Sequence, residues 1–256
     1  MRGPYKKENN IILSISGFWE SADRIRHLIS ESSNYKYQLI EDVLFCEGER
    51  EGIIFYFDDS VNSLTKNSVH SDANQLITEP GGKLNQHEST VYLKYKGGSA
   101  ENAKKMMLAG NSFLDIGGYE IKIVTSGITH SKETWQKLIE NDRVMDLIFA
   151  FVITIHNDKE DFYFTCGMHN LGYPDAIVPG YLDYDGANYL AKAFLYYLLL
   201  YDPVLHYDSR FRIDETSLEI YRLTHENCHI YDDYDENIFQ LFHNPYGIWR
   251  LTESNI

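Results

Sequence analysis

The sequence predicts an α+β fold, with a mixed, largely antiparallel sheet or sheets packed against helices. Two observations favour this class: strand and helix patterns are mixed along the chain, and short turn sequences suggest hairpins. The 256 residues, 43% of them hydrophobic and 24% charged, can bury one large core. We expect a single composite domain over 1–256, with an N-terminal half at 11–128 and an acidic C-terminal half at 129–256, and a short sequence echo suggests that the two halves have a similar αβ architecture.

Strand patterns alternate with helix patterns in the N-terminal half. Ser21 can cap a short helix whose apolar residues recur at spacings of three and four. A second helix is expected at 100–108, and the Glu47–Arg50 turn suggests a hairpin. The polar residues 58–88 predict a long loop. The expected strands are 11–19, 38–46, 53–57, 90–95 and 119–125.

The C-terminal half contains the most apolar helix pattern of the chain, Ala187 to Leu200, which we expect to be buried over much of its surface. Ser131 can cap another helix that runs to Ile139. The sequence Tyr-Leu-Lys-Tyr-Lys-Gly from Tyr92 is echoed by Tyr-Leu-Asp-Tyr-Asp-Gly from Tyr181, which suggests two similar halves. The expected strands are 148–156, 162–166, 217–224, 238–242 and 247–251.

Nothing in the sequence predicts a membrane protein. The most apolar stretch, Leu147 to Ile155, is about half the length of ~20 residues that a spanning helix needs. The apolar run after the basic N-terminus is too short and too polar for a signal peptide. Three cysteines without close pairs suit a reducing compartment, so we expect a cytoplasmic protein.

The net charge of −15 is concentrated in the second half of the chain. Residues 144–256 hold 18 acidic and 6 basic side chains, whereas residues 1–143 hold 20 and 17. A field of this sign repels nucleic acids and anionic membranes and attracts a basic protein. Alternatively, the acidity serves solubility alone.

One literal metalloprotease motif, His-Glu-x-x-His, starts at His225 and ends at His229. On a helix, the two histidines would share a face and could bind zinc, while Glu226 activated a water molecule. The context argues against this, because the preceding residues alternate as in a strand and no third ligand is evident. We therefore expect no cofactor and keep the zinc-dependent hydrolase as an alternative.

A second catalytic possibility is Cys166 with His169 three residues later, as a nucleophile and its base. No third orienting group is identifiable, and a buried cysteine at a strand end is the commoner case. The chain has no phosphate-binding loop, nucleophile elbow or dinucleotide fingerprint. The sequence thus shows no complete active site.

Many of the 20 tyrosines stand beside carboxylates in the C-terminal half. Tyrosine offers a large contact area at low entropic cost, and neighbouring carboxylates would steer a basic partner. The alternative is that these segments are exposed loops with tyrosines packed beneath them. The candidate partner-binding residues are Asp183, Tyr184, Asp185, Tyr231, Asp232, Asp233, Tyr234, Asp235 and Glu236.

Residues 162–178 contain a strand ending in Thr-x-Gly-Met, followed by a turn with Gly-x-Pro-Asp. This pattern resembles the bacterial family catalogued as domain of unknown function 4261. The segment Gly117–Ser131 with Trp135, and the closing Asn244–Leu251, fit the same resemblance, which covers most of the chain but weakens before residue 90. The clustered family-like residues are expected to be architectural; they are Thr165, Gly167, Met168, Gly172, Pro174 and Asp175.

The resemblance implies a bacterial cytosolic α+β protein, and some such proteins look like members of toxin–immunity gene sets. It carries over no catalytic residue. Together with the acidic half, it predicts an immunity protein that binds and neutralises a basic toxin, in its sharpest form a nuclease. A generic adaptor module is the further alternative.

Overall fold

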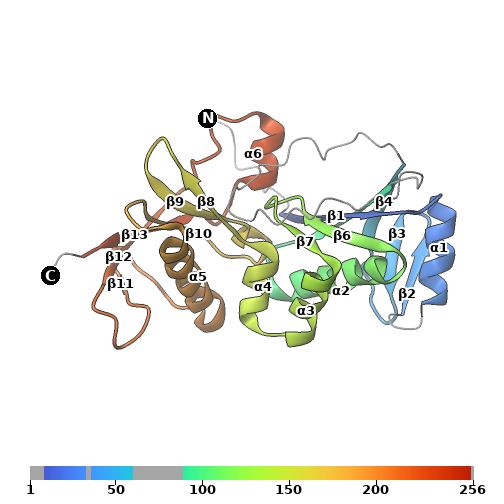
Figure 1. Ribbon diagram of the computed structural model, residues 1–256, viewed down its shortest axis with the longest axis horizontal. Coiled ribbons are helices and arrows are strands. Elements are labelled where there is room, and N and C mark those ends of the chain that lie inside the picture. The colour runs from blue at the N-terminus through green and yellow to red at the C-terminus, as the bar shows by residue number, and fades with distance from the viewer. Residues whose placement is uncertain (1–8, 33–35, 60–88, 255–256) are drawn as a thin grey trace. The chain divides into compact units, whose positions relative to one another are not determined.

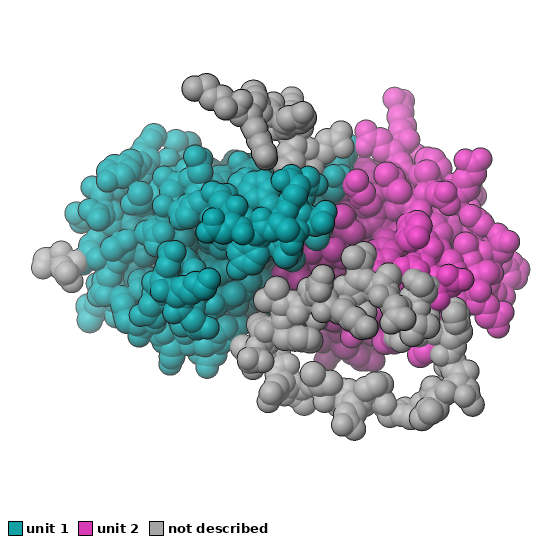
Figure 2. Space-filling model, turned by 90° about the horizontal axis from the view of Figure 1, so that it is seen from above, with its two compact units in different colours: residues 1–10, 96–103, 141–256 teal, residues 11–95, 104–140 magenta. Residues whose placement is uncertain are grey.

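The computed structural model describes residues 9–32, 36–59 and 89–254 and confirms the α+β class, with 34% helix and 32% strand. The chain divides into two compact units (Figure 2). The N-terminal unit holds 11–95 and 104–140, and the C-terminal unit holds 1–10, 96–103 and 141–256. The division falls after residue 140, not after 128, because the segment 129–140 belongs with the first sheet.

The first sheet has seven strands in the order β2-β3-β4-β5-β1-β6-β7 (Figure 1). Its strands are β1 (Asn10–Gly17), β2 (Tyr37–Ile40), β3 (Val43–Cys46), β4 (Ile53–Asp58), β5 (Ser89–Lys96), β6 (Gly118–Ile123) and β7 (Thr129–Ser131). The helices of this part of the chain are α1 (Ala22–Glu31), α2 (Ala100–Asp115) and α3 (Lys132–Asn141). The expected loop at 58–88 lies almost wholly outside the described residues.

Local signals account for several of these elements. Ser21 caps α1, where its side chain accepts a hydrogen bond from the Arg24 amide at 3.2 Å. In β5, buried residues alternate with more exposed ones, as one buried sheet face requires. Trp135 of α3 is fully buried, and its indole donates to the Met107 carbonyl at 3.2 Å. A satisfied indole makes this large ring suitable as a core residue.

The second sheet has six strands in the order β11-β12-β13-β10-β9-β8. Its strands are β8 (Ile153–Asn157), β9 (Phe162–Cys166), β10 (Asp175–Pro179), β11 (Arg210–Phe211), β12 (Tyr221–Glu226) and β13 (Ile248–Glu253). The α-helices with it are α4 (Val144–Phe151), α5 (Tyr184–Tyr201) and α6 (Glu236–Phe242), and a short 3-10 turn covers Met168–Asn170. In the described ranges, no helix is both long and apolar enough to cross a membrane.

Three expected strands differ from the structure, two of them in part and one entirely. The segment 38–46 is a hairpin, because the chain reverses at Glu41, which has a positive φ of 51°. Residues 148–151 belong to α4, where Asp146 in the first turn accepts hydrogen bonds from the Arg143 amide at 3.0 Å and from the Arg143 guanidinium, and the strand β8 starts only at Ile153. Residues 238–242 lie in α6, which Asp235 caps. The echo of Tyr92 also fails as a structural repeat, since β5 corresponds to a loop and the start of α5.

Helices α5 and α6 cover opposite faces of the second sheet (Figure 1). Phe162 and Phe164 of β9 belong to the core cluster against which Phe239 and Phe242 of α6 pack. Tyr163, between them in β9, instead contacts Tyr184 of α5. Since successive side chains of a strand point to opposite faces, the two helices lie on different sides.

A buried carboxylate joins the segments at one end of this sheet. Asp175 is 2% exposed and accepts hydrogen bonds from the Thr165 hydroxyl at 3.0 Å, the Met168 amide at 3.2 Å and the Asn244 side-chain amide at 2.6 Å. Asn244 also donates to the carbonyl of Tyr173 at 2.9 Å. These contacts connect β9, the 3-10 turn, β10 and the turn before β13. Thr165 and Asp175 of the Thr-x-Gly-Met and Pro-Asp pattern therefore have an architectural role.

Two glycines allow the tight turns at the end of the sheet where Asp175 lies. Gly167, at φ 127°, and Gly172, at φ 91°, adopt backbone angles that side chains with a Cβ rarely reach. A Cβ on Gly172 would lie 2.4 Å from the carbonyl oxygen of Gly98. The backbone of the turn can approach the Gly98 carbonyl this closely only because residue 172 is glycine.

We predict that Asp175→Asn flattens the pH dependence of stability. Burial raises the pKa of Asp175 from 3.8 to about 7 despite its hydrogen bonds. A raised folded-state pKa contributes stability below pH ~4 that is lost as the pH rises to ~7, by about 4 kcal/mol at most. The free energy of unfolding, measured by urea denaturation between these pH values, should fall more steeply in the parent protein than in the variant.

Comparing the parent protein with the variant isolates the effect of Asp175. The Arg143–Asp146 pair also makes stability depend on pH, in the opposite direction, but it is present in both proteins. That pair lowers the pKa of Asp146, so its stabilisation is lost as the pH falls. The variant also loses the bond from Asn244, which lowers its stability at every pH without changing the slope. Equal slopes in the two proteins would contradict the prediction.

Candidate binding surface

Helix α5 carries the surface with the strongest binding features. Asp183 caps it and accepts a hydrogen bond from the Gly186 amide at 2.8 Å. Its sheet-facing residues recur at helical spacing, which makes one buried stripe. The buried residues are Ala187, Leu190, Ala191, Phe194, Leu195 and Leu198. The remaining face of the helix is free to carry other side chains.

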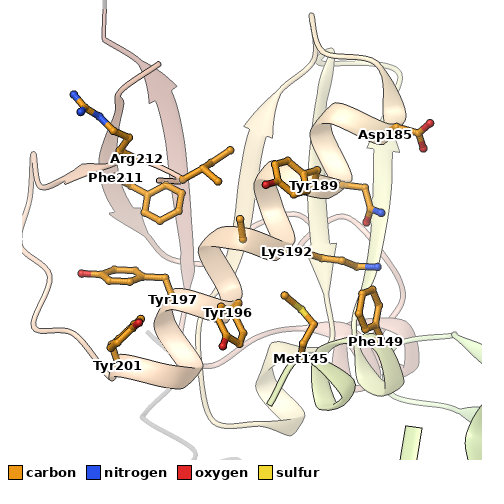
Figure 3. Close-up of a pocket in the computed structure, with 13 residues that line it drawn as sticks. Met145, Phe149, Asp185, Tyr189, Lys192, Tyr196, Tyr197, Tyr201, Phe211 and Arg212 are labelled. Atoms are coloured by element: carbon orange, nitrogen blue, oxygen red, sulfur yellow. The ribbon is translucent and has the colours of Figure 1, made fainter. Parts of the chain in front are cut away.

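That outer face forms the floor of an open groove of about 550 Å³ (Figure 3). Its walls are α4 on one side and the segment after β11 on the other. The lining is dominated by aromatic rings, and Tyr189 and Tyr201 are 63% and 66% exposed. The lining residues are Met145, Phe149, Asp185, Asn188, Tyr189, Lys192, Ala193, Tyr196, Tyr197, Tyr201, Phe211, Arg212 and Ile213. We call this surface the α5 groove.

Polar groups are few in the α5 groove. The Lys192 ammonium lies 4.6 Å from the centre of the Phe149 ring, and burial lowers the pKa of this lysine. The Asn188 side chain accepts a hydrogen bond from the Thr154 hydroxyl at 2.9 Å, which ties the helix to β8. Figure 3 shows the Arg212 side chain pointing away from the neighbouring Phe211 and Tyr197 rings. The groove thus offers rings and phenol hydroxyls more than charge.

Exposed carboxylates lie next to lining residues of the groove along the chain. Asp183 and Asp185 lie at the start of α5, Asp202 follows its last residue, and Asp214 with Glu215 follows Ile213. All five side chains are exposed. An aromatic centre with a charged, solvent-exposed rim is the usual arrangement of a protein–protein interface.

The first predicted segment, 183–185, lies at this surface. Asp185 lines the groove and is exposed. Tyr184 is half-buried against Tyr163, and burial raises its pKa. Asp183 has a structural role as the cap of α5. The structure therefore places one exposed carboxylate of this segment at the groove.

The second predicted segment, 231–236, lies before and at the start of α6, on the other face of the sheet. The prediction that Tyr231 lies at the surface is wrong, because this side chain is 8% exposed and packs against Phe164 and Phe242. Its ring fills space under α6, so it cannot meet a partner. The exposed members are Asp232, Asp233, Tyr234, Asp235 and Glu236, of which Asp235 caps α6. The two segments do not form one site.

The His-Glu-x-x-His motif does not have the helical geometry that a zinc site of this type needs. His225 and Glu226 end β12, and His229 follows in a turn. The His225 ring packs against Trp249 and its Nε2 lies 3.0 Å from the Tyr246 carbonyl oxygen, while Glu226 accepts from Arg250 at 2.8 Å. Residues 225 and 226 point to opposite faces of their strand. Within the described residues, no group of three or more potential ligands is placed to hold a metal ion.

Cys166 lacks the properties of an activated nucleophile. It is 1% exposed, and burial followed by the nearby Asp175 carboxylate raises the pKa of its thiol well above the ordinary value. A protonated thiol is a poor nucleophile. His169 is equally buried, in the 3-10 turn. The pair belongs to the packed end of the sheet.

Comparisons with family models, curated proteins and solved structures found no match for this chain. The resemblance to domain of unknown function 4261 therefore stays a prediction, and the argument for function rests on the groove and its charges.

Sequence reasoning missed most of the groove. A signal was present, because Tyr189, Tyr196 and Tyr197 are offset from the apolar stripe of α5. A helix that only needs one buried face would carry polar residues there. Tyr201 and the wall residue Phe149 belong to the same surface. These side chains were overlooked because the helix was expected to be buried over much of its surface.

We predict that only one thiol reacts quickly in the native protein. Cys46 is partly exposed, whereas Cys166 and Cys228 are buried, and burial raises the pKa of both thiols. A chromogenic disulfide reagent should titrate one thiol at first and all three in denaturant. Cys46→Ser should abolish the fast reaction, and fast reaction of Cys166 in that variant would contradict its buried placement.

Proposed function

We propose that this protein binds and neutralises a basic protein partner, a toxin nuclease in the sharpest form of the proposal, through the α5 groove and its carboxylate rim. The observation that carries the proposal is the position of an exposed aromatic groove within the most acidic part of the chain. Exposed tyrosines provide contact energy, and carboxylates provide attraction and orientation.

The charge favours a partner of opposite sign over a second copy of this chain. Two copies, each with a net charge of −15, repel when their acidic halves approach. A basic protein gains attraction over the same distances, which raises the association rate and makes it sensitive to salt. An acidic cover over a cationic active site would also exclude a nucleic acid substrate from it.

The aromatic side chains suit this role because the fold does not need them on the outside. Tyr189 and Tyr201 are about two-thirds exposed, so their rings contribute little to the core. Side chains of this kind are the ones that gain most when a partner removes them from water. On the α6 side of the sheet, Tyr234 is 56% exposed.

We predict that Tyr189→Ala and Tyr201→Ala each weaken the complex with a neutralised toxin by about 30-fold, which corresponds to roughly 2 kcal/mol for a central tyrosine. The partner to test is the basic product of a gene adjacent to this one. Growth rescue on co-expression and calorimetric titration of the purified pair give the readouts. Affinity should also fall between about 0.05 M and 0.5 M salt.

Matched variants separate the two faces. Tyr234→Ala on the α6 side and Tyr56→Ala in the N-terminal unit replace tyrosines of similar exposure, 56% and 61%. Both should leave affinity unchanged, and thermal unfolding should confirm that all four variants fold. If Tyr234→Ala weakens binding and the groove variants do not, the interface lies on the α6 face. If no basic neighbour is bound or neutralised, the proposal is wrong.

A further inference from the structure

One lysine of the α5 groove has no acidic partner. Lys192 is half-buried, and its ammonium lies 4.6 Å from the centre of the Phe149 ring. With the residues that the structure describes, it forms no ion pair and no hydrogen bond. Burial lowers the pKa of this lysine, and no described carboxylate raises it. A positive charge is therefore held in the groove without a counter-ion.

This part of the chain has no shortage of carboxylates. Residues 144–256 hold 18 acidic and 6 basic side chains, and Arg250, for example, donates to Glu226 at 2.8 Å. Asp185 lines the same groove as Lys192, but it stands seven residues earlier on α5. That spacing is two helical turns, whereas ion pairs along a helix form between residues three or four apart. The position of Lys192 on α5 thus leaves its charge unpaired.

Apolar and aromatic side chains line the groove next to Lys192. Tyr189 lies three residues before it and Tyr196 four residues after it, and these spacings place the three side chains on one face of α5. Met145 and Phe149 stand four residues apart on α4 and line the same groove, and Phe149 is 40% exposed. Figure 3 shows the Lys192 side chain extending from α5 toward Phe149. We call these five residues the Lys192 subsite.

We propose that the Lys192 subsite binds a small aromatic carboxylate, that is, a planar ring system with one carboxylate group. The ring packs against the apolar and aromatic lining, and the carboxylate accepts hydrogen bonds from the Lys192 ammonium. The groove volume of about 550 Å³ lies within the range of roughly 300–1,000 Å³ that is usual for small-molecule sites. Such sites are mostly apolar and have a few polar groups that orient the ligand. This inference goes beyond toxin binding and does not depend on it.

A single carboxylate fits this subsite better than either an uncharged group or a group of higher charge. A half-buried ammonium gains most from an opposite charge, because partial removal from water strengthens their attraction. A ligand with two negative charges finds no second cation here, since Arg212, the other basic residue of the groove, points away from the neighbouring rings (Figure 3). It is also repelled more strongly by a chain with a net charge of −15.

The test compares 2-naphthoate with 2-naphthamide, which has a similar shape and no charge, by isothermal titration calorimetry on the intact protein. We expect 2-naphthoate to bind with a Kd on the order of 0.1 mM, about tenfold more tightly than the amide. Lys192→Met removes the ammonium and keeps a long, flexible side chain. This variant should bind the two compounds with about equal affinity, because only the charge distinguishes them.

Lys159→Met is the matched control, since it changes the net charge by the same amount. Lys159 is exposed in the turn between β8 and β9 and does not line the groove, so this variant should keep the preference for 2-naphthoate. Thermal unfolding should confirm that both variants fold. The inference is overturned if the intact protein does not bind 2-naphthoate, or if the preference survives Lys192→Met.

A carboxylate of a protein partner is the other group that could pair with Lys192, and the test separates the two. If 2-naphthoate does not bind but Lys192→Met weakens the complex with a basic toxin, the ammonium pairs with that partner and the small-molecule site is wrong. If 2-naphthoate binds as expected while no basic neighbour is bound or neutralised, the proposed function is wrong and the Lys192 subsite stands.

Discussion

The buried carboxylate of Asp175 is the interaction on which the C-terminal unit depends. It gathers donors from β9, the 3-10 turn and the Asn244 turn, and the Thr165 hydroxyl in turn accepts from the Ala176 amide at 2.9 Å. A buried polar network of this kind favours a single arrangement of these segments only when each of its polar groups has a hydrogen-bond partner. It holds β10 between β9 and β13, and β10 is a strand against which α5 packs. The position of the groove on the outer side of α5 therefore depends on the buried carboxylate of Asp175.

The outer face of α5 is the part of this unit that folding does not explain. The sheet requires only the buried stripe from Ala187 to Leu198, and that stripe anchors the helix. Exposed rings such as Tyr189 and Tyr201 instead add apolar surface, which favours unwanted association. Nearby carboxylates counter this by keeping copies of the chain apart. Such a balance makes sense if another protein covers the rings during function, because that partner then removes the apolar surface from water.

Features that depend on neighbouring residues could be predicted from the sequence better than features that depend on tertiary packing. Ser21 and the stripe of α5 were predictable, since a cap and a helical repeat are read from neighbouring residues. The segments in α4 and α6 were wrong because short apolar runs suit a strand or a helix, and the caps at Arg143–Asp146 and Asp235 decided between them. Tyr231 was misplaced for a different reason: its neighbours are exposed, and only the packing of α6 on Phe164 shows that its ring points inward.

The acidic residues of this unit separate into two kinds once their positions on helices are known. Asp183 and Asp235 cap the starts of α5 and α6, where a carboxylate satisfies backbone amides and the helix dipole favours it. The formal charge of these residues is therefore explained by the fold. Asp202 has the opposite placement, at a helix end that favours cations. Composition alone treats these carboxylates as equal, whereas the structure shows that capping of a helix start accounts for Asp183 and Asp235 but not for Asp202.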